Sequence, residues 1–248
     1  MSGKRYGSIH NVLYYECEKT HRMTLSMLLN VLIQVSGEQS VKLGLSDEKM
    51  AELGYAWIVL QHSFSVKRMP RANETIHVET QATQYNKFFC YRNFYVKDDN
   101  GEELVNFTMV FAILDMEKRK MIRIPAEVVE PYGAPFEKGL LRVPRPVELN
   151  EEDAGSSTYN VRYFDIDANN HVNNSKYIEW MLDSLGADFL TEHELKSGNI
   201  KFEKELLYGQ HVTSLASVSE KTDNIQTAHR IQTADCVHCT ASFEWKGN

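Results

Sequence analysis

The residues best suited to chemistry lie together in one polar stretch of the chain, residues 163–174. Within it, Asp167, Asn169 and His171 occupy alternate positions, just before an amphipathic helix predicted to begin near Ser175. An imidazole can move a proton, a carboxylate can orient that imidazole, and a carboxamide can hold a water molecule or a carbonyl group. This stretch is therefore the candidate site for acid–base chemistry.

A structural interpretation competes with the chemical one, because Asp and Asn also favour turns and helix N-caps. For Asp165, Asn173 and Asn174 we prefer the structural interpretation, with Asn173 or Asn174 as the helix cap. It is weaker for His171 and for Glu205, which lies much further along the chain. These two side chains share a purpose only if the chain at Glu205 folds beside the start of the helix.

The elements that must position these residues form a diverged repeat: a loop, one long apolar helix, then alternating strands. In the first half, apolar residues surround nearly all of a helix at 23–36, which predicts burial on most sides. Strands are predicted at 57–64, 76–82, 88–96 and 105–113, with a tight hairpin at Asn100-Gly101. In the second half, helical spacing at 178–189 precedes strand-like runs near 199–207, 212–220 and 225–245, the last holding two strands or one bent strand.

Five of the six prolines fall between residues 125 and 146, which predicts a linker between the halves. Periodicity alone predicts an α+β protein with a tandem repeat. The halves differ at the start of their helices. The first-half counterpart of the polar stretch, Glu16 to Arg22, looks shorter and lacks the Asp, Asn, His spacing. One half is thus predicted to keep the chemistry and the other only the shape.

Composition and charge exclude several classes of protein. The 248 residues are 42% hydrophobic and 25% charged, as in globular proteins. With 27 basic and 34 acidic residues the net charge is −7, which disfavours general binding to nucleic acid or anionic membranes. No apolar run follows the basic start of the chain, and the apolar stretch 25–35 is too short and interrupted to span a bilayer. We expect a cytoplasmic protein without membrane insertion.

Four cysteines give no disulfide framework. Cys236 and Cys239 form a CxxC pair, but the alternation of the surrounding residues predicts a strand with the two thiols on opposite faces. No second such pair completes a zinc site. We therefore expect structural roles for the thiols, no metal and no organic cofactor.

The run from Asp165 to Ile178 resembles the signature of the fatty acyl-acyl-carrier-protein thioesterases. The resemblance implies a double (tandem) hotdog fold, in which a curved antiparallel sheet wraps long central helices. It implies an N-terminal hotdog at 1–124 with the acyl pocket, a Pro-rich linker at 125–155 and a C-terminal hotdog at 156–248 with the catalytic loop. The implied reaction is hydrolysis of fatty acyl-acyl-carrier protein to free fatty acid. The alternatives are an acyl-CoA thioesterase of the same fold and a non-catalytic acyl-binding module.

Carried over by position, the resemblance assigns Asp167, Asn169 and His171 to the catalytic loop and Glu205 to the strand after the helix. The family often has cysteine directly after this glutamate. Leu206 stands here, which excludes a Cys-His mechanism through that site.

These residues suit thioester hydrolysis, although which residue acts as the base stays open. His171 can position or deprotonate water, and Glu205 can share that task. Asn169 can orient water or the carbonyl, and Asp167 can fix the loop or the imidazole. An oxyanion could be met at the start of the helix by backbone N–H groups, those of Val172, Asn173 and Asn174.

The carrier protein is acidic in the family picture, so an acidic enzyme needs a local basic surface. Two basic stretches are candidates, although each is also simply a solvated loop: Lys67, Arg68 and Arg71, and Lys118, Arg119 and Lys120. Part of the first-half core would be hollow to receive the acyl chain. The sequence leaves the preferred chain length open, as well as the oligomeric state, monomer or homodimer.

Overall fold

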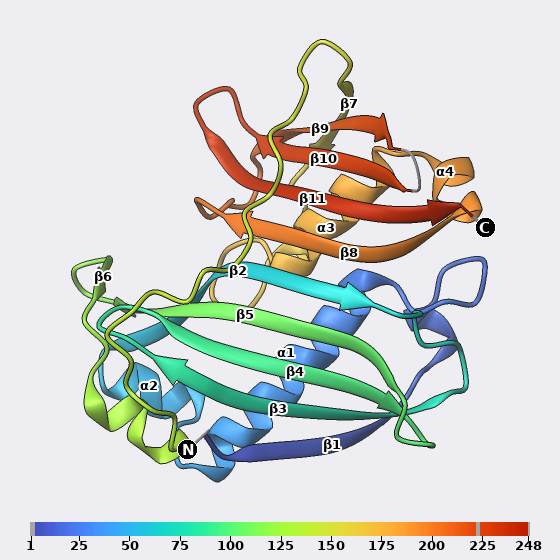
Figure 1. The fold of residues 1–248 in the computed structure, drawn as a ribbon. Helices are drawn as coiled ribbons and strands as arrows, with labels where there is room; N and C mark the ends of the chain where they lie inside the picture. The colour runs from blue at the N-terminus through green and yellow to red at the C-terminus, as the bar shows by residue number, and fades with distance from the viewer. Residues whose placement is uncertain (1–2, 222–223, 248) are drawn as a thin grey trace.

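A computed structural model describes residues 3–221 and 224–247, which form two halves joined along one antiparallel sheet (Figure 1). The N-terminal half contains β1 (Arg5–Asn11), β2 (Tyr55–Val66), β3 (Thr75–Tyr85), β4 (Cys90–Asp98), β5 (Glu103–Asp115), β6 (Lys120–Ile122), α1 (Leu25–Lys42) and α2 (Asp47–Glu52). The C-terminal half contains β7 (Gly155–Asn160), β8 (His193–Phe202), β9 (His211–Glu220), β10 (Ile225–Gln232), β11 (Val237–Gly247), α3 (Asn174–Asp183) and α4 (Ala187–Glu192). Short 3-10 turns are η1 (Tyr14–Glu16), η2 (Ala126–Val128), η3 (Glu130–Tyr132) and η4 (Tyr163–Asp165).

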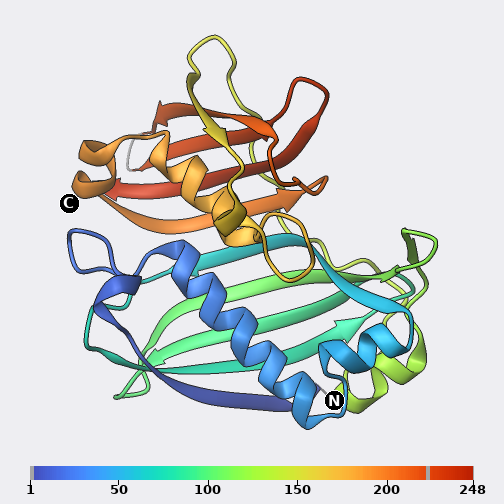
Figure 2. The same cartoon turned by 180° about the vertical axis from the view of Figure 1, so that it is seen from behind.

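The strands follow one another across the sheet in the order β1-β3-β4-β5-β2-β8-β11-β10-β9-β7, with β6 paired to the end of β5. The seam between the halves is the pairing of β2 with β8, from Gln61↔Lys201 to Ser65↔Ser197. The helices α1 and α3 lie on the same face of the curved sheet (Figure 2). Each half is thus a central helix wrapped by antiparallel strands, which confirms the predicted α+β double hotdog.

One hydrophobic core runs through both halves between the helices and the sheet. Leu28 and Leu32 of α1 share it with Ile178 and Met181 of α3, and all four are fully buried. The apolar residues that surround α1 in the sequence are needed because the helix is covered on most sides. Burial of this apolar surface is the main favourable contribution to folding.

The seam is closely packed, because β8 has a glycine where aromatic rings cross it. A Cβ atom on Gly198 would lie 2.5 Å from ring atoms of both Phe64 and Phe243. Phe64 stacks on Phe107 with ring centroids 4.7 Å apart. Packing of this density fixes the positions of the side chains that β2 and β8 bring to the seam.

Both long helices differ in extent from the sequence prediction. α1 continues to Lys42 rather than ending near residue 36, and Gln39 anchors its last turns by donating from Nε2 to the carbonyl of Lys4 (2.9 Å). The predicted helix 178–189 is divided into α3 and α4. α3 ends at Asp183 with Ser184 as its C-cap, and Gly186, with a φ of 84°, is the N-cap of α4.

The predicted strands of the first half correspond to β2–β5, and the hairpin between β4 and β5 is confirmed. Gly101 has a φ of 82°, and its N–H donates to the carbonyl of Asp98 (3.0 Å). The run 225–245 holds two strands, β10 and β11. The strands β1 and β7 were not predicted, because their residues are mostly polar and form strands by pairing with β3 and β9.

The segment 125–155, predicted as a linker, begins as part of the N-terminal half. Val128 and Tyr132, on η2 and η3, are buried in a second hydrophobic cluster. The later part crosses the sheet as a loop beside β2 (Figure 1), where Gln61 Nε2 donates to the carbonyl of Val143 (3.4 Å). The domain limits at 124 and 156 stay a prediction.

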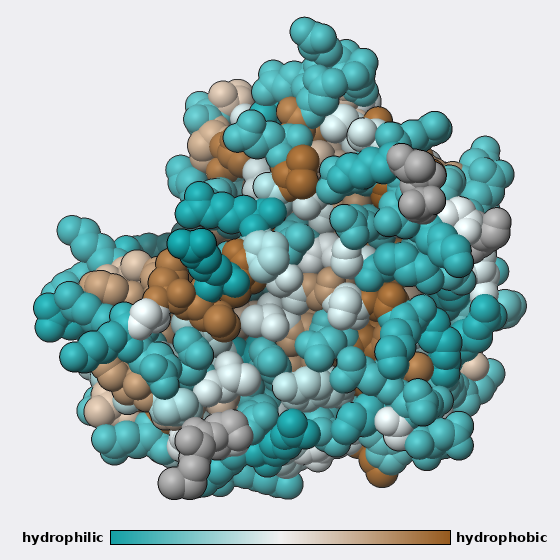
Figure 3. Space-filling model, in the orientation of Figure 1, coloured by the Kyte–Doolittle hydropathy of each residue, from teal (hydrophilic) through white to brown (hydrophobic). Residues whose placement is uncertain are grey.

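Figure 3 shows that the outer face of the sheet is mainly hydrophilic, with hydrophobic patches in the notch between the two halves. Within residues 3–221 and 224–247, no helix combines the length and the hydropathy needed to cross a membrane.

Candidate active site

The polar stretch forms a tight loop between β7 and α3, and its own backbone hydrogen bonds hold it. The N–H of Asp167 donates to the carbonyl of His171, and the N–H of Asn170 donates to the carbonyl of Asp167, both at 3.0 Å. Asn170 has a φ of 65°, a left-handed conformation that Asn tolerates better than most residues. The loop folds back on itself and presents Asp167, Asn169 and His171 at its turn.

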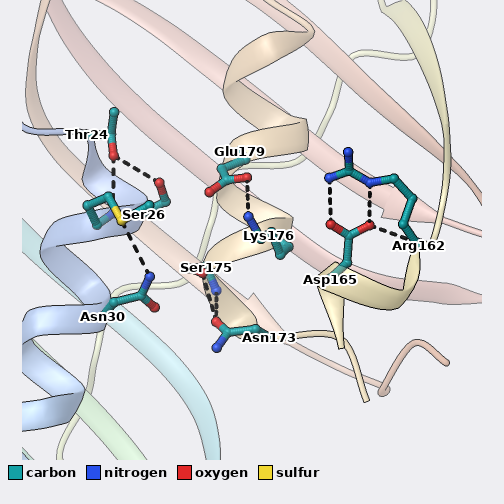
Figure 4. Close-up of polar contacts among 10 residues, drawn as sticks. Thr24, Ser26, Asn30, Arg162, Asp165, Asn173, Ser175, Lys176 and Glu179 are labelled. Atoms are coloured by element: carbon teal, nitrogen blue, oxygen red, sulfur yellow. Dashed lines mark hydrogen bonds and ion pairs between the residues drawn. The ribbon is translucent and has the colours of Figure 1, made fainter. Parts of the chain in front are cut away.

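Other polar residues of the stretch hold the loop and the helix in place (Figure 4). Asp165 is 1% exposed and accepts hydrogen bonds from the backbone N–H (2.8 Å) and the guanidinium of Arg162 (2.8 and 3.1 Å). Burial acts to raise the pKa of Asp165, but the bonds and charge of Arg162 outweigh it and hold the pKa below its ordinary value. Asn173 is the N-cap of α3, since its Oδ1 accepts from the N–H of Ser175 (2.9 Å). The structural interpretation of Asp165 and the capping role of Asn173 are confirmed.

Asp167 and His171 lie close enough to interact electrostatically. Nδ1 of His171 is 3.9 Å from Oδ1 of Asp167, which is too long for a hydrogen bond. Their side chains are 32% and 24% exposed, so both reach solvent. The same Asp167 oxygen accepts the N–H of Asn169 (2.8 Å), whose residue is exposed. Catalytic hydrogen bonds often shorten only when substrate binds, so this geometry suits an imidazole that is still to be oriented.

Glu205 lies in the loop after β8 rather than on the strand, because β8 ends at Phe202. The next residue, Leu206, is fully buried and attaches this loop beside the start of α3. Its N–H donates to the hydroxyl of Tyr177 (3.0 Å), and its carbonyl accepts the N–H of Val172 (2.8 Å). The chain at Glu205 is thus tied to the polar loop.

One cavity of about 1420 Å³ borders all four predicted catalytic side chains, Asp167, Asn169, His171 and Glu205. From the polar loop it continues into the N-terminal half between α1 and the sheet. There its walls are largely apolar and include Leu29, Ile33, Trp57, Ala82 and Phe111. The structure therefore joins the four side chains to a space large enough for a long apolar ligand.

A buried arginine borders this cavity on β4, far from the seam in the strand order. Arg92 is 7% exposed, and its Nη1 donates to Gln39 Oε1 (2.5 Å) and Thr80 Oγ1 (3.1 Å). Its guanidinium lies 4.9 Å from the ring centroid of Tyr132, and burial lowers the pKa of Arg92. A charged side chain thus forms part of the wall in the otherwise largely apolar part of the cavity.

Two of the three backbone N–H groups predicted to meet an oxyanion are already bonded. The N–H of Val172 donates to Leu206, and the N–H of Asn173 donates to the carbonyl of Asp165 (2.9 Å). Neither group can turn to a ligand without losing its present acceptor. The prediction is corrected for these two residues, and Asn174, the first residue of α3, stays a candidate.

The two predicted basic stretches lie in different surroundings. Arg119, in the turn between β5 and β6, pairs with Glu205 (Nη2 to Oε1, 2.5 Å) and borders the cavity. Its neighbour Lys118 pairs with Asp115. Lys67, Arg68 and Arg71 follow the other end of β2, where Arg68 pairs with Glu74 (2.6 Å). Of the six predicted contacts, Arg119 is the one that lines the cavity.

The CxxC pair lies outside this cavity. Cys239 is buried in the core on β11, and Cys236 lies just before that strand, with Sγ 3.5 Å from Nε2 of His238. Both are free thiols. Among the described residues, no group of three or more His, Cys, Asp or Glu side chains is placed to hold a metal ion.

Two contacts that organise the site were not predicted from the sequence. Tyr177 anchors Leu206 through its hydroxyl, and burial raises the pKa of that phenol. The sequence signal for the Tyr177 contact was that Tyr177 lies within the run that resembles the family signature. The ion pair of Arg119 with Glu205 joins the two halves of the chain, and no local pattern signals such a contact.

The fold and the loop define a class: a double-hotdog protein with an Asp, Asn, His loop at the start of its second central helix. The family model for the acyl-ACP thioesterase N-terminal domain matches residues 3–132, and the model for the C-terminal domain matches residues 148–247. The chain belongs to the acyl-acyl-carrier-protein thioesterase family.

Solved and curated relatives agree with this membership. A crystal structure described as an oleoyl thioesterase from Lactobacillus plantarum is 35% identical with a TM-score of 0.96, over 99% of this chain and 97% of that one. The 12:0-ACP thioesterase from Umbellularia californica is 22% identical with a TM-score of 0.87, over 98% and 94%, and shows the same fold. The palmitoyl-acyl carrier protein thioesterase of Arabidopsis thaliana is 28% identical over 78% of this chain and 48% of its own length. The chain spans about half the length of the curated relatives it matches.

Proposed function

We propose that this chain hydrolyses the thioester of fatty acyl-acyl-carrier protein, which releases a free fatty acid and the carrier thiol and ends chain elongation. The observation that carries the proposal is the cavity that joins the polar loop to the interior of the N-terminal half. A fatty acyl thioester has a reactive polar end and a long apolar tail. It therefore needs a polar site and an apolar space that are continuous with each other. The names of the relatives support the choice of substrate.

In the proposed reaction, water attacks the thioester carbonyl while His171 takes a proton from it. Asp167, 3.9 Å away, stabilises the imidazolium that forms. Glu205 shares the acid–base work at the mouth of the cavity, and Asn169 holds the water or the carbonyl by its amide. The C–S bond then breaks, the acyl carbon keeps the water oxygen as the free fatty acid, and the departing sulfur takes the proton from the His171 imidazolium and leaves as the thiol.

The proposed oxyanion donor is the N–H of Asn174, at the N-terminal end of α3. Helix N-termini carry a partial positive charge that favours an oxyanion. The neighbouring amides of Val172 and Asn173 hold the loop instead. One backbone donor and the Asn169 amide then share the developing charge.

The acyl chain is proposed to lie in the N-terminal half, between α1 and β2–β5. The apolar walls at Ile33, Trp57 and Phe111 suit a hydrocarbon chain, since they remove it from water.

The carrier is proposed to dock at the turn that holds Lys118, Arg119 and Lys120, of which Arg119 borders the cavity. An acidic carrier and a chain of net charge −7 repel each other overall, so a local basic patch is needed to orient them. Lys67, Arg68 and Arg71 suit this role less, because none of them borders the cavity.

The test compares thiol release from acyl-carrier protein and acyl-CoA that bear the same acyl chain. We expect the larger kcat/KM on the carrier ester. An equal or larger value on the CoA ester would make the chain an acyl-CoA thioesterase of the same fold. Release from neither ester, with acyl binding retained, would favour the non-catalytic module. The cytoplasmic location and the oligomeric state stay predictions, and the plant relatives are named as chloroplastic.

A further inference from the structure

His238 on β11 is a buried histidine, 1% exposed, that contacts the chain around Glu205. Its Nδ1 lies 3.1 Å from the carbonyl oxygen of Lys204 and 3.2 Å from that of Glu205. Carbonyl oxygens only accept hydrogen bonds, so Nδ1 carries the hydrogen and can share it between the two. Among the described residues, Glu205 borders the cavity and His238 does not. His238 can therefore affect the site only through the residues that it holds.

The two carbonyl groups belong to the peptide groups on either side of the Glu205 Cα atom. Because a peptide group is planar, the orientation of these two groups sets φ and ψ of Glu205 and so the direction in which its side chain leaves the backbone. The second group is also held at its other end, since the N–H of Leu206 donates to the hydroxyl of Tyr177 (3.0 Å). His238 and Tyr177 thus fix the point from which the Glu205 carboxylate reaches the cavity.

The backbone of His238 holds the same loop. Its carbonyl accepts the N–H groups of Glu203 (2.8 Å) and Lys204 (3.2 Å). Strand β8 ends at Phe202, and the loop that follows lies beside the start of β11 (Figure 1). The side chain and the backbone of one residue therefore hold the chain where it leaves the sheet, just before Glu205.

The turn between β10 and β11 orients the ring of His238 from its other side. Nε2 faces Thr233 Oγ1 (3.1 Å) and Cys236 Sγ (3.5 Å). With the hydrogen on Nδ1, Nε2 of the neutral ring is an acceptor, so the hydroxyl of Thr233 can donate to it. Both nitrogens of the ring thus have partners, and these partners hold the ring in one orientation. Cys236 of the CxxC pair takes part in this contact.

The first half has a leucine at the corresponding position. In each half, the first residue after the strand at the seam donates its N–H to the second residue of a later strand. Lys67 donates to Leu104 of β5 (2.9 Å), as Glu203 donates to His238 of β11. Leu104 is also buried, at 3% exposed. A leucine therefore suffices to fill this position, and the histidine adds the hydrogen bonds to the carbonyl groups beside Glu205.

We propose that His238 is a positioning residue for thioester hydrolysis, because it holds both peptide groups beside Glu205 and so directs the Glu205 carboxylate into the cavity. This deepens the proposed function and rests on it for the role of Glu205. In this role His238 touches no atom of the substrate. A misplacement of about 1 Å in a reacting group can cost about 100-fold in rate, so the hold on the backbone matters for turnover.

The test measures kcat and KM for thiol release from dodecanoyl-acyl-carrier protein, together with the thermal midpoint of each variant. His238→Leu copies the first half and should lower kcat by about 10- to 100-fold with KM unchanged, because it displaces Glu205 and leaves the acyl pocket intact. In a Glu205→Gln background the same change should lower kcat no further, since no carboxylate is left to position. An unchanged kcat in His238→Leu, or an equal loss in both backgrounds, would overturn the proposal.

Three further variants separate positioning from a general loss of stability. In asparagine the amide nitrogen is as many bonds from Cα as Nδ1 is in histidine, whereas in glutamine it is one bond further. His238→Asn should therefore retain more of the kcat than His238→Gln, whether or not His238→Leu folds. The control His229→Leu, at a buried histidine that bonds Thr227 Oγ1 (2.8 Å), should leave kcat unchanged. Equal kcat values in the Asn and Gln variants, or an equal loss in His229→Leu, would refute the positioning role.

Crystal structures of His238→Leu and His238→Asn provide a measurement that does not depend on turnover. The peptide groups beside Glu205 should turn in His238→Leu and keep their orientation in His238→Asn. Unchanged peptide groups in the leucine variant would refute the positioning role even in an active enzyme. Turned peptide groups in a protein that hydrolyses no thioester would support the positioning of Glu205 and refute only the proposed hydrolysis.

Discussion

The loops before α1 and α3 have the same backbone and different side chains. In the second loop the N–H of Asp167 bonds the carbonyl of His171. In the first, the N–H of Glu18 bonds the carbonyl of Arg22 (2.9 Å). His21 and Asn170 are both left-handed, with φ of 64° and 65°. The sequence suggested that the first loop is shorter, and the structure shows that it is not. The repeat is therefore preserved in the backbone of the two loops.

The side chains on this common scaffold serve different purposes. In the second loop, His171 borders the cavity. At the equivalent position of the first loop, Arg22 donates to the carbonyls of Leu190 (2.9 Å) and His193 (3.4 Å) and so ties that loop to α4. Pro70 accepts the N–H of Met23 as Leu206 accepts that of Val172. Met69 therefore stands at the position that Glu205 holds in the second half. One loop joins the two halves, and the other can carry chemistry.

Exchanging the side chains should produce the largest effect. Asp167→Glu, Asn169→Thr and His171→Arg together give the second loop the side chains of the first, which already fit this backbone. We expect the thermal midpoint of the unsubstituted protein to be retained. We expect kcat to fall by ~10²–10⁴-fold, which is the contribution of a positioned acid–base group. The reverse exchange at Glu18, Thr20 and Arg22 should create no activity. Turnover retained in the first variant would remove the catalytic assignment.

Glu205→Gln should lower turnover by ~10² or more if the carboxylate takes part in acid–base chemistry. Met69→Gln, at the corresponding position of the first half, is the matched control and should leave kcat unchanged. A loss below tenfold would favour a positioning role for Glu205. Leu206→Cys should not add a thiol route, and activity that becomes sensitive to alkylation would argue against a water mechanism.

Ala82→Phe should shift the products towards shorter fatty acids, because Ala82 borders the cavity in the N-terminal half. One methylene in an apolar site changes selectivity by ~10–200-fold, so product profiles can detect a small loss of depth. Overpacking can cost ~1–3 kcal/mol, so the free energy of unfolding must be measured as well. Equal losses for every chain length would refute the acyl pocket, and a length shift from substitutions in residues 212–245 would place it in the other half.

Asp165→Asn should lower the free energy of unfolding by about 1–3 kcal/mol, because it weakens the buried bonds to Arg162. The pKa of Asp165 lies below its ordinary value in the folded protein. The stabilisation by its carboxylate is therefore complete above the ordinary carboxyl pKa of about 4 and is lost as the pH falls through the lower folded value. Unfolding measured at neutral and acid pH should show the difference between the proteins shrinking in acid. A difference that is independent of pH would contradict this role.

Local patterns predicted much of the fold and the site. The alternation at 57–113 predicted β2–β5, and the Asp, Asn, His spacing predicted the loop. The edge strands β1 and β7 could not be predicted in the same way, because pairing rather than apolar alternation stabilises them. The hydrogen bonds of the Val172 and Asn173 amides could not be predicted either. The acceptor for Val172 is Leu206, which is distant in sequence, and the acceptor for Asn173 is Asp165, which comes close only when the loop folds. The contact of Arg119 with Glu205 exists only after the two halves meet.

The most direct test of the central claim is thiol release from acyl-carrier protein by His171→Ala and Arg22→Ala, measured in parallel with their thermal midpoints. These residues occupy the same position on the two loops. His171→Ala should lose turnover by ~10²–10⁴ and keep its midpoint. Arg22→Ala should keep turnover and lose stability, because it removes hydrogen bonds to Leu190 and His193. Retained turnover in His171→Ala, or an equal loss in both variants at an unchanged midpoint, would contradict the assignment of the chemistry to the second loop.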